Sequence, residues 1–237
     1  QAVLRLQSKE IDTAEVSILG IFPHDIMRNV NRYTYLIARE HGRLLNFKPR
    51  FVVEGGTLRL VPIPELSVEK LGLLNGRVGE LFNHEVFLPD NNIGPVTLQF
   101  PYTWTVLKLL MHERVRSRVT GRASWNRFLA PEHISNALQV TLGITQKFYE
   151  ECRVRGKKCF TLFYPTPTSY NHYVKSGEIA IGTLSSEMDR LNLPNLVLSP
   201  FIRNRLGQRD ICELVTSPAK CTGHFNAEGN RIISEIV

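Results

Sequence analysis

Several features that would assign a function at once are missing from this sequence of 237 residues. No apolar run approaches the roughly 20 residues that a membrane-spanning helix needs, and no charged start, apolar stretch and small-residue cleavage site marks a signal peptide. The sequence begins with Gln1 rather than Met, so we expect that a preceding segment was removed or is missing, and the lack of a signal leaves the compartment open. Zinc-finger spacing, an RNP-type aromatic motif and a Gly-rich phosphate loop are also lacking, which removes the most easily recognised nucleic-acid and nucleotide sites.

The composition is that of an ordinary globular protein. Apolar residues make up 43% and charged residues 22%, and the length suits one large domain over residues 1–237. Lysine and arginine exceed aspartate and glutamate by seven, 29 against 22, which permits an anionic partner such as nucleic acid or an acidic polysaccharide. The densest basic stretches, 112–127 and 153–158, alternate with valine or follow a predicted helix, so a solvated surface is favoured over a nucleic-acid footprint.

Only four cysteines are present, in two close pairs, and four cysteines allow three connectivities. Cys212 and Cys221 flank the loop "CELVTSPAKC", where we predict a disulfide with Cα atoms within about 7 Å. Such a bridge favours an extracytoplasmic compartment. Cys152 fits the apolar face of a predicted helix and Cys159 a buried strand, so we expect this second pair to be reduced and part of the core.

Apolar periodicity predicts strands that alternate with helices. Residues 14–20, 158–164 and 195–199 have the pattern of buried parallel strands, whereas 50–62 predicts a β-hairpin outside their sheet. A long amphipathic helix is predicted from Pro131 to just before Gly156. Strands separated by helices imply right-handed crossovers and a helix–sheet–helix sandwich, with its chemistry at the carboxyl ends of the strands.

The final stretch, "TGHFNAEGNRIISEIV", places a histidine just before a predicted helix. Asn226 is a suitable N-cap, and the apolar face of the helix follows at helical spacing with Ile232 and Ile233. His224 would lie on a short loop two residues outside the helix N-terminus. A histidine fixed in this way can act as a base, although most loop histidines are merely partly exposed.

Three stretches resemble, in this order, the SGNH (GDSL-type) hydrolases: "SILGIFPHDIMRNVNRYTYL", "FKPRFVVEGGTLRLVPIP" and "GHFNAEGNRIISEI". The likeness covers most of the chain and is to the central and C-terminal parts of the family, particularly a bacterial branch with an inserted hairpin that often accompanies polysaccharide modification. It implies a flavodoxin-like three-layer α/β/α sandwich with a parallel sheet and an inserted hairpin. It also implies an esterase or O-acyltransferase activity, for which we expect no cofactor and no metal.

The resemblance assigns roles to individual residues. His224 matches the catalytic histidine of the family, which takes the proton of a serine hydroxyl. An asparagine after a sheet strand helps to form the oxyanion hole of the family. In the matching stretch "GIFPHD", His24 stands at that place, and Asn29 is nearby but offset.

The sequence departs from the family at the nucleophile and at the acid. The family serine lies in a Gly-Asp-Ser motif after the first strand, but this sequence has neither an Asp-Ser pair nor a Gly-x-Ser-x-Gly elbow. The opening "QAVLRLQ" resembles a helix that comes later in the family, so we expect the first strand and its serine to lie upstream. Cys221 replaces the usual aspartate three residues before the histidine, which leaves Asp210, Glu213 or a backbone carbonyl to orient His224.

Three functions follow from these observations. The first is an esterase or acyltransferase that acts on an acylated carbohydrate or another small ester, with its nucleophile outside this sequence. The second is a non-catalytic member of the same fold that binds anionic polysaccharide, and the third is a basic nucleic-acid-binding α/β protein. Ser124 is the nearest stray nucleophile, but its place beside Trp125 favours a capped or packed turn. No sequence feature indicates an oligomeric state.

Overall fold

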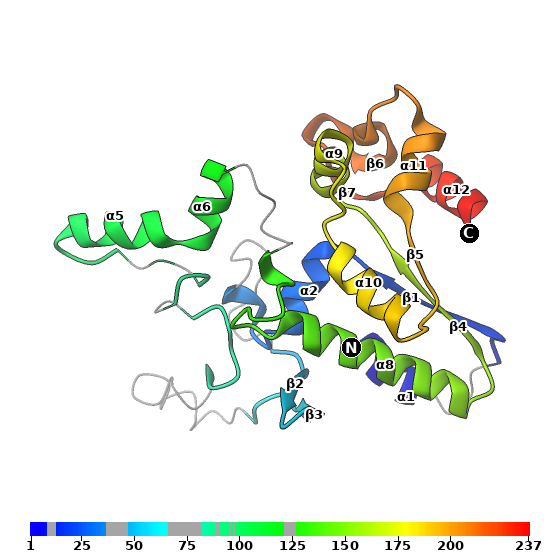
Figure 1. Ribbon diagram of the computed structural model, residues 1–237, viewed down its shortest axis with the longest axis horizontal. Helices are drawn as coiled ribbons and strands as arrows, with labels where there is room; N and C mark the ends of the chain where they lie inside the picture. The colour runs from blue at the N-terminus through cyan, green and yellow to red at the C-terminus, as the bar shows by residue number, and fades with distance from the viewer. Residues whose placement is uncertain are drawn as a thin grey trace. The chain divides into compact units, whose positions relative to one another are not determined.

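The computed structural model describes residues 1–8, 13–36, 47–65, 82–88, 91–94, 96, 98–120 and 127–237. The chain forms two compact units (Figure 1). We call them, after the β-structure of each, the hairpin unit (Gln1–Arg5 and Ile26–Ile144) and the sheet unit (Leu6–Asp25 and Thr145–Val237).

The sheet unit contains a parallel sheet of three strands in the order β1-β4-β5. These strands are β1 (Val16–Ile21), β4 (Lys158–Phe163) and β5 (Asn195–Val197). Val16 pairs with Lys158, and Thr161 pairs with Asn195. The predicted parallel strands are therefore confirmed, except that β5 is shorter than expected because helix α11 already begins at Leu198.

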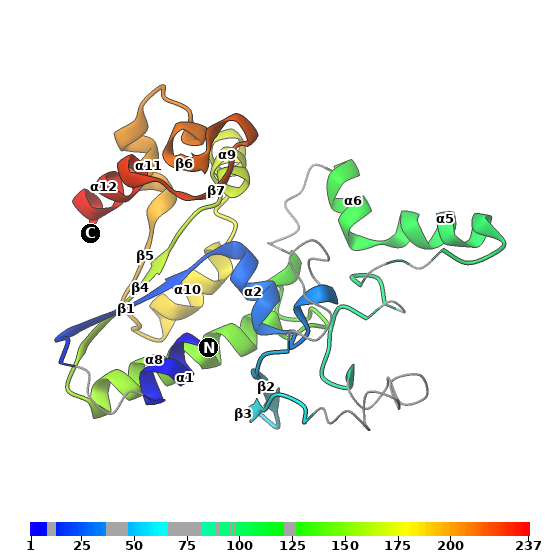
Figure 2. The same cartoon turned by 180° about the vertical axis from the view of Figure 1, so that it is seen from behind.

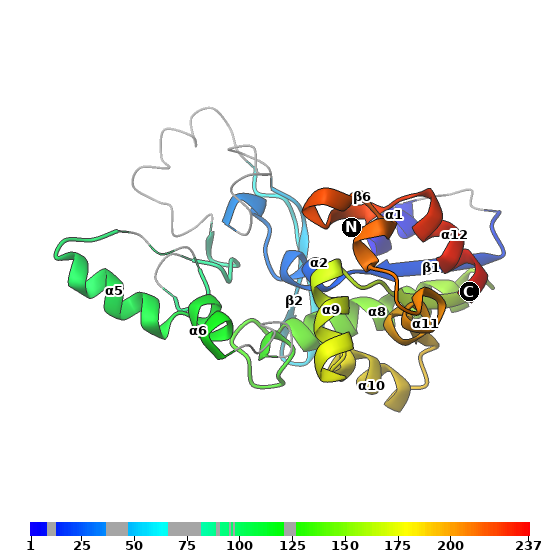
Figure 3. The same cartoon turned by 90° about the horizontal axis from the view of Figure 1, so that it is seen from above.

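Helices cover both faces of this sheet. Alternate side chains of a strand point to opposite faces: Thr161 of β4 meets the hydroxyl of Tyr149 on one face at 3.1 Å, whereas Leu162 packs with Leu198 and Ile232 on the other. Seen from above, helices α8 (Ala137–Val154) and α10 (Gly182–Arg190) lie on one side of β1 and α12 (Ala227–Ile236) lies on the other (Figure 3). The protein thus has the expected mixed α/β class with a parallel sheet between helical layers.

An apolar cluster joins the sheet to the last part of the chain. Its elements include α9 (Pro167–Ser176), α11 (Leu198–Leu206) and the 3-10 helix η3 (Ile211–Leu214). After η3 come β6 (Val215–Ser217), the 3-10 helix η4 (Pro218–Lys220) and β7 (Thr222–Phe225). The buried members of the cluster are Leu162, Tyr170, Leu198, Ile202, Leu206, Ile211, Leu214, Phe225, Ile232 and Ile233. Full burial of one such aliphatic or aromatic side chain contributes about 1.5–3 kcal/mol, so this cluster fixes the segments that surround His224.

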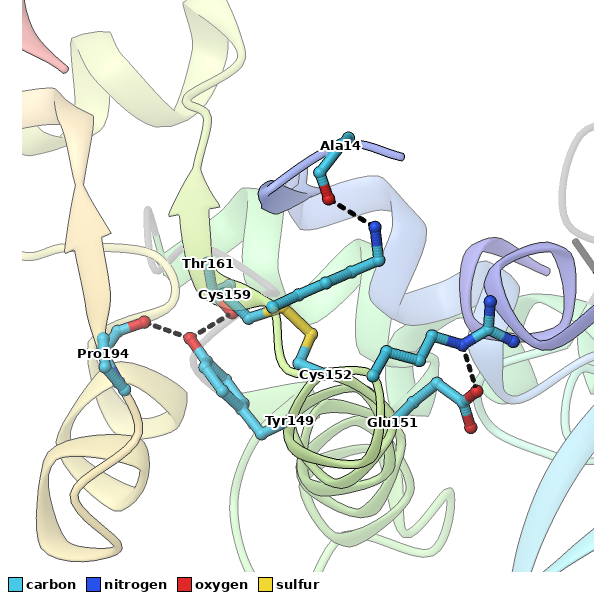
Figure 4. Close-up of a disulfide and its surroundings, with 9 residues drawn as sticks. Ala14, Tyr149, Glu151, Cys152, Cys159, Thr161 and Pro194 are labelled. Atoms are coloured by element: carbon cyan, nitrogen blue, oxygen red, sulfur yellow. Dashed lines mark hydrogen bonds and ion pairs between the residues drawn. A yellow bond between two sulfur atoms is a disulfide. The ribbon is translucent and has the colours of Figure 1, made fainter. Parts of the chain in front are cut away.

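The expectation that Cys152 and Cys159 are reduced was wrong. They form a disulfide with a Cα–Cα distance of 6.1 Å, between the last turns of α8 and the start of β4 (Figure 4). The chain reverses between them at Gly156, whose φ of 64° is easily adopted only by glycine. The reversal turns the two apolar positions toward each other, and the bridge ties the helix to the sheet.

The predicted start of the long helix was also wrong. Helix α8 begins at Ala137 rather than near Pro131. Asn136 has a left-handed conformation with φ of 51°, which interrupts any helix that would run through it. The Ser135 hydroxyl oxygen then accepts a hydrogen bond from the backbone N of Ala137 at 3.2 Å. Residues 131–136 therefore form turns ahead of the helix.

The hairpin unit contains the predicted hairpin as its own two-stranded sheet. Strands β2 (Arg50–Glu54) and β3 (Thr57–Val61) pair antiparallel. Gly55 and Gly56 form the turn with φ of 55° and 78°. A tight two-residue hairpin turn requires positive φ at both central residues. The remaining described elements of the chain are α1 (Ala2–Ser8), α2 (Pro23–Asn29), the 3-10 helix η1 (Thr34–Leu36), α5 (Tyr102–Met111) and α6 (Glu113–Thr120). Among the described residues, no helix has the length and apolarity to cross a membrane.

Candidate active site

The first part of the site follows strand β1. The strand ends at Ile21, and Pro23 opens α2, where its fixed φ and missing N–H suit the first helical turn. Asp25 stabilises this start, because its Oδ2 accepts a hydrogen bond from the backbone N of Phe22 at 3.1 Å. His24 is therefore held in the first turn of α2, at the carboxyl end of β1, with 43% of its side chain exposed.

The ring of Phe22 contacts both histidines of the candidate site. It stacks on His24 with 5.3 Å between ring centroids, and His224 meets it edge-on at 6.4 Å. The same ring stacks on Tyr164, directly after β4, at 5.0 Å. Gly20 leaves room for this arrangement, since a Cβ there would lie 3.0 Å from Cε2 of Tyr164. The structure thus brings His24 and His224 to one aromatic cluster at the carboxyl end of the sheet.

His224 lies on strand β7 rather than in the loop expected from the sequence. Strand β7 pairs antiparallel with β6, and Phe225 faces Val215. The two strands approach each other closely at Gly223, where φ is 105° and a Cβ would lie 2.2 Å from Oγ1 of Thr216. This position therefore requires glycine. Because of this pairing, the backbone at His224 is extended, and the side of the strand on which its ring lies is fixed.

Two further constraints fix the backbone on either side of His224. Cys212 and Cys221 form the predicted disulfide, with a Cα–Cα distance of 4.6 Å. The Asn226 side chain accepts a hydrogen bond from the backbone N of Gly229 at 2.9 Å, which confirms the predicted N-cap of α12. The histidine therefore lies between a covalent cross-link and a capped helix, both of which limit its movement.

The ring of His224 faces solvent. Within the described part of the chain it contacts Phe22 but makes no hydrogen bond and no ion pair. Asp210 accepts a hydrogen bond from the first turn of η3 at 2.9 Å, and Glu213 pairs with Nε of Arg209 at 3.0 Å. These two carboxylates therefore have other partners in this structure.

A potential metal cluster near the histidine consists of Asp210, Cys212 and Cys221, whose ligand atoms lie within 4.8 Å of one another. Cysteine binds metals as a thiolate, but both sulfur atoms belong to the disulfide. The group is therefore a helix cap beside a cross-link.

Two other residues, Asn29 and Ser124, were considered from the sequence. Asn29 belongs to the hairpin unit, where its Nδ2 donates a hydrogen bond to Oγ1 of Thr141 at 3.5 Å. Ser124 lies outside the described residues.

A small pocket lies beside Tyr164, lined in part by Pro23, Ser169 and Ser199 from segments that follow the three strands. The hydroxyl of Ser169 is used in the capping box of α9 with Thr166, and both serines are buried, with 4% and 6% exposure. A nucleophile must reach the substrate, so neither serine fits that role in this structure. Burial also raises the pKa of the Tyr164 phenol, which keeps it protonated as a possible hydrogen-bond donor.

A second polar constellation, which no sequence pattern predicted, lies in the hairpin unit. Nδ1 of His133 lies 2.7 Å from Oγ of Ser135, and Nε2 of the same ring lies 3.2 Å from a carboxylate oxygen of Glu113. The hydrogen bond from His133 holds the pKa of Glu113 below its usual range. Ser135 is 2% exposed, and its Oγ also accepts the bond from Ala137. The serine therefore stabilises the start of α8, while His133 and Glu113 line an adjoining pocket with Arg127.

The 20-residue separation of His133 and Glu113 gave no periodic signal. The only local sign in the sequence was the short spacing from His133 to Ser135, which polar turns before helices commonly have.

The chain matches no protein-family model, and neither curated proteins nor solved structures give a match. The residues of the site are therefore the basis for a functional assignment.

Proposed function

We propose that this protein is a serine-dependent ester hydrolase or O-acyltransferase of SGNH type, acting on an acylated carbohydrate or another small ester, with His224 as the general base. The observation that carries the proposal is the position of His224. It is exposed on a rigid strand beside Phe22, at the carboxyl end of a parallel sheet, where sites in α/β folds are usually found.

The chemistry requires a serine that these 237 residues do not supply in the family motif. In the proposed reaction, His224 removes the proton from the serine hydroxyl while the oxygen attacks the acyl carbon. The ester C–O bond then breaks, and the imidazolium returns the proton to the departing alcohol oxygen. Water, or a second sugar hydroxyl in a transferase, accepts the acyl group in the reverse sequence of steps. An exposed ring has room for such a hydroxyl at roughly 3 Å.

The open edge of β1 supports a nucleophile from outside the sequence. Glu15 O and Ile21 O accept hydrogen bonds from the β4 side, and a parallel strand uses alternate residues toward one neighbour. The backbone groups of Val16, Ile18 and Gly20 therefore point away from β4, and β4 is the only described strand that pairs with β1. An additional parallel strand at this edge would have its carboxyl end at the same side of the sheet as His224.

The two disulfides support an extracytoplasmic site of action, because structural disulfides persist mainly in oxidising compartments. Both bridges lie in the sheet unit, and one of them is three residues from His224. Acylated extracellular carbohydrate is a substrate class that such a location would offer.

Hydrolysis of an aryl acetate tests the proposal. We expect the 237-residue chain to be inactive, the protein expressed from the complete reading frame to be active, and His224→Ala to lower kcat of that complete protein by about a thousandfold or more. His172→Ala is the matched control, since His172 is a histidine of the same unit that pairs with Glu178; it should retain full activity.

His133→Ala, made in both the complete protein and the 237-residue chain, distinguishes the two histidine constellations, and the complete protein should keep its activity in this variant. Full activity of His224→Ala would remove that histidine from the mechanism. Turnover by the 237-residue chain that is lost in His133→Ala would instead place the reaction at the pocket of the hairpin unit, and the proposal would be wrong.

A further inference from the structure

Helix α5 carries an unusual surface. Nearly all of its apolar side chains face solvent, including Trp104 with 56% exposure, Leu110 with 62% and Met111 with 66%. Phe100, just before the helix, is 87% exposed. Large contiguous apolar patches on a protein surface mark sites of interaction with proteins or membranes. We call these side chains, from Phe100 to Met111, the α5 surface.

Polar contacts, rather than apolar packing, hold α5 in place. Thr105 is the only residue of the helix that is buried, and its hydroxyl exchanges hydrogen bonds with the backbone N and O of Gln99, both at 3.0 Å. After the last turn, Nε2 of the buried His112 lies 2.7 Å from the carbonyl oxygen of Gly94. Among the described elements of its unit, α6 is the one that packs most closely against α5 (Figure 2). The helix is thus anchored at its ends while its apolar side chains point outward.

The distribution of these side chains favours a lipid phase over a protein groove. At 100° per residue, apolar side chains and one threonine cover an arc of roughly 220° around the helix, from Leu109 through Tyr102, Val106 and Leu107 to Trp104. A helix that docks into a protein groove uses a single stripe at i, i+3, i+4 and i+7. Lys108, on the remaining side, is the only charged residue of α5. A fluid apolar phase can contact so wide an arc, whereas a groove contacts one stripe.

The residues in and beside α5 suit two features of a membrane surface, namely the interface at the level of the headgroups and the negative charge of anionic headgroups. Phe100, Tyr102 and Trp104 are aromatic and exposed, and tyrosine and tryptophan are enriched at the level of lipid headgroups. The following helix, α6, has three arginines and one glutamate in the sequence "ERVRSRVT". Arginines beside an exposed apolar helix complement anionic headgroups.

We propose that α5 and α6 bind the surface of an anionic phospholipid bilayer, with α5 lying in the plane of the interface. The length of α5, 10 residues, corresponds to about 15 Å and is half of what a spanning helix needs. The proposal therefore concerns a helix that lies on the membrane. It does not depend on the proposed esterase activity, because every residue that carries it belongs to the hairpin unit.

Vesicle flotation of the 237-residue chain tests the proposal. We expect binding to vesicles of phosphatidylcholine with about one quarter phosphatidylglycerol, weaker binding to pure phosphatidylcholine, and weakening by salt. Trp125→Phe leaves Trp104 as the only tryptophan of the chain, and its fluorescence should shift to shorter wavelength on binding. The double variant Leu107→Gln/Leu110→Gln should lower the partition coefficient at least about tenfold, since both leucines lose apolar contact with the bilayer.

Ile134→Gln/Val154→Gln is the matched control, because these two residues are 66% and 80% exposed and lie outside α5. It should bind as the unchanged chain does, and circular dichroism should confirm that all variants are folded. Failure to bind anionic vesicles would overturn the proposal. A concentration-dependent dimer that Leu107→Gln/Leu110→Gln dissociates, in a chain that does not bind vesicles, would show instead that a second copy covers the α5 surface.

Discussion

The two units of the protein are stabilised by different kinds of contact. The sheet unit has an apolar cluster to which β4, α9, α11, η3, β7 and α12 contribute buried side chains, and both disulfides lie in this unit. The hairpin unit has buried aromatic residues as well, but a charged network lies among them. One chain therefore stabilises one region by apolar burial and covalent bonds and another by buried polar groups.

Glu85 is the centre of the polar network. Its carboxylate accepts hydrogen bonds from the backbone N of Arg32 at 2.9 Å and of Tyr33 at 3.1 Å, and from Nε of Arg32 at 3.3 Å. Arg50 is also buried, and its Nη1 donates to the carbonyl oxygens of Val30 and His84. Burial lowers the pKa of Arg50 to about 10. The contacts of Glu85 join segments 52 and 53 residues apart, so loss of the carboxylate would take the acceptor from two backbone N–H groups and the anionic partner from the buried Arg32.

The largest expected effect therefore belongs to Glu85→Ala. We expect it to lower the free energy of unfolding of the hairpin unit by about 3–5 kcal/mol, because a buried ion pair that loses one partner leaves an uncompensated charge. Hydrogen exchange followed by mass spectrometry should show lost protection around β2 and β3 and unchanged protection in β4. Glu187→Ala removes a surface pair with Arg190 and should cost less than about 1 kcal/mol. Equal loss of protection in both units would contradict the contrast between them.

The same carboxyl group gives a pH dependence. Burial is the largest influence on Glu85 and raises its pKa, although the hydrogen bonds from Tyr33 and Arg32 lower it. A carboxyl group with a higher pKa in the folded state binds its proton more tightly when folded. Its contribution to the unfolding free energy is full below the unfolded pKa and is lost as the pH rises through the folded value. Urea unfolding of Glu85→Gln should lack this decline, whereas a profile identical to that of the unchanged chain would contradict the assignment.

Reduction of the disulfides should destabilise the sheet unit instead of the hairpin unit, and each single bridge should contribute less than Glu85 does. All four cysteines of the chain lie in the sheet unit, and the bridges span 7 and 9 residues. Loops of this size correspond to about 2–3 kcal/mol each in the chain-entropy description. We expect dithiothreitol to lower hydrogen-exchange protection in β4 and α12 and to leave β2 and β3 unchanged.

The double variant Cys212→Ser/Cys221→Ser separates the two bridges. It should lose protection around β6 and β7 while the connection of α8 to β4, held by Cys152 and Cys159, stays protected. Loss of protection that begins in the hairpin unit on reduction would reverse the comparison.

The sheet unit could be predicted from the sequence because its signals are local. The parallel strands followed from short apolar runs, the hairpin of the other unit from two alternating segments around paired glycines, and the cap of α12 from the single side chain of Asn226. The start of α8 was wrong because a positive φ at Asn136 leaves no pattern in the sequence. The Cys152–Cys159 bridge was missed because both residues also fit apolar core positions.

The polar contacts could not be predicted in the same way. Arg32 and Glu85 are 53 residues apart, and no periodicity relates them. The same holds for Phe22, whose ring contacts both His24 and His224: the sequence predicted chemistry at the carboxyl ends of the strands, but not that this ring would contact both histidines. Contacts between the side chains of distant segments depend on how the whole chain packs, and only the structure shows this packing.

The smallest expected effect on stability concerns the open edge of β1. Val16 and Ile18 are 52% and 51% exposed, so Ile18→Lys should change the free energy of unfolding by less than about 0.5 kcal/mol. An apolar strand with an unpaired edge promotes association, and a lysine at that edge opposes it. We therefore expect light scattering of the concentrated 237-residue chain to fall in Ile18→Lys but not in Val154→Lys, which places the same charge on an exposed helix position.

If the proposed upstream strand occupies this edge, the complete protein should scatter little light. Ile18→Lys should then lower the esterase activity of the complete protein, because the strand that carries the serine would be displaced. Equal scattering by the short chain and the complete protein would argue that this edge is not where the missing strand pairs.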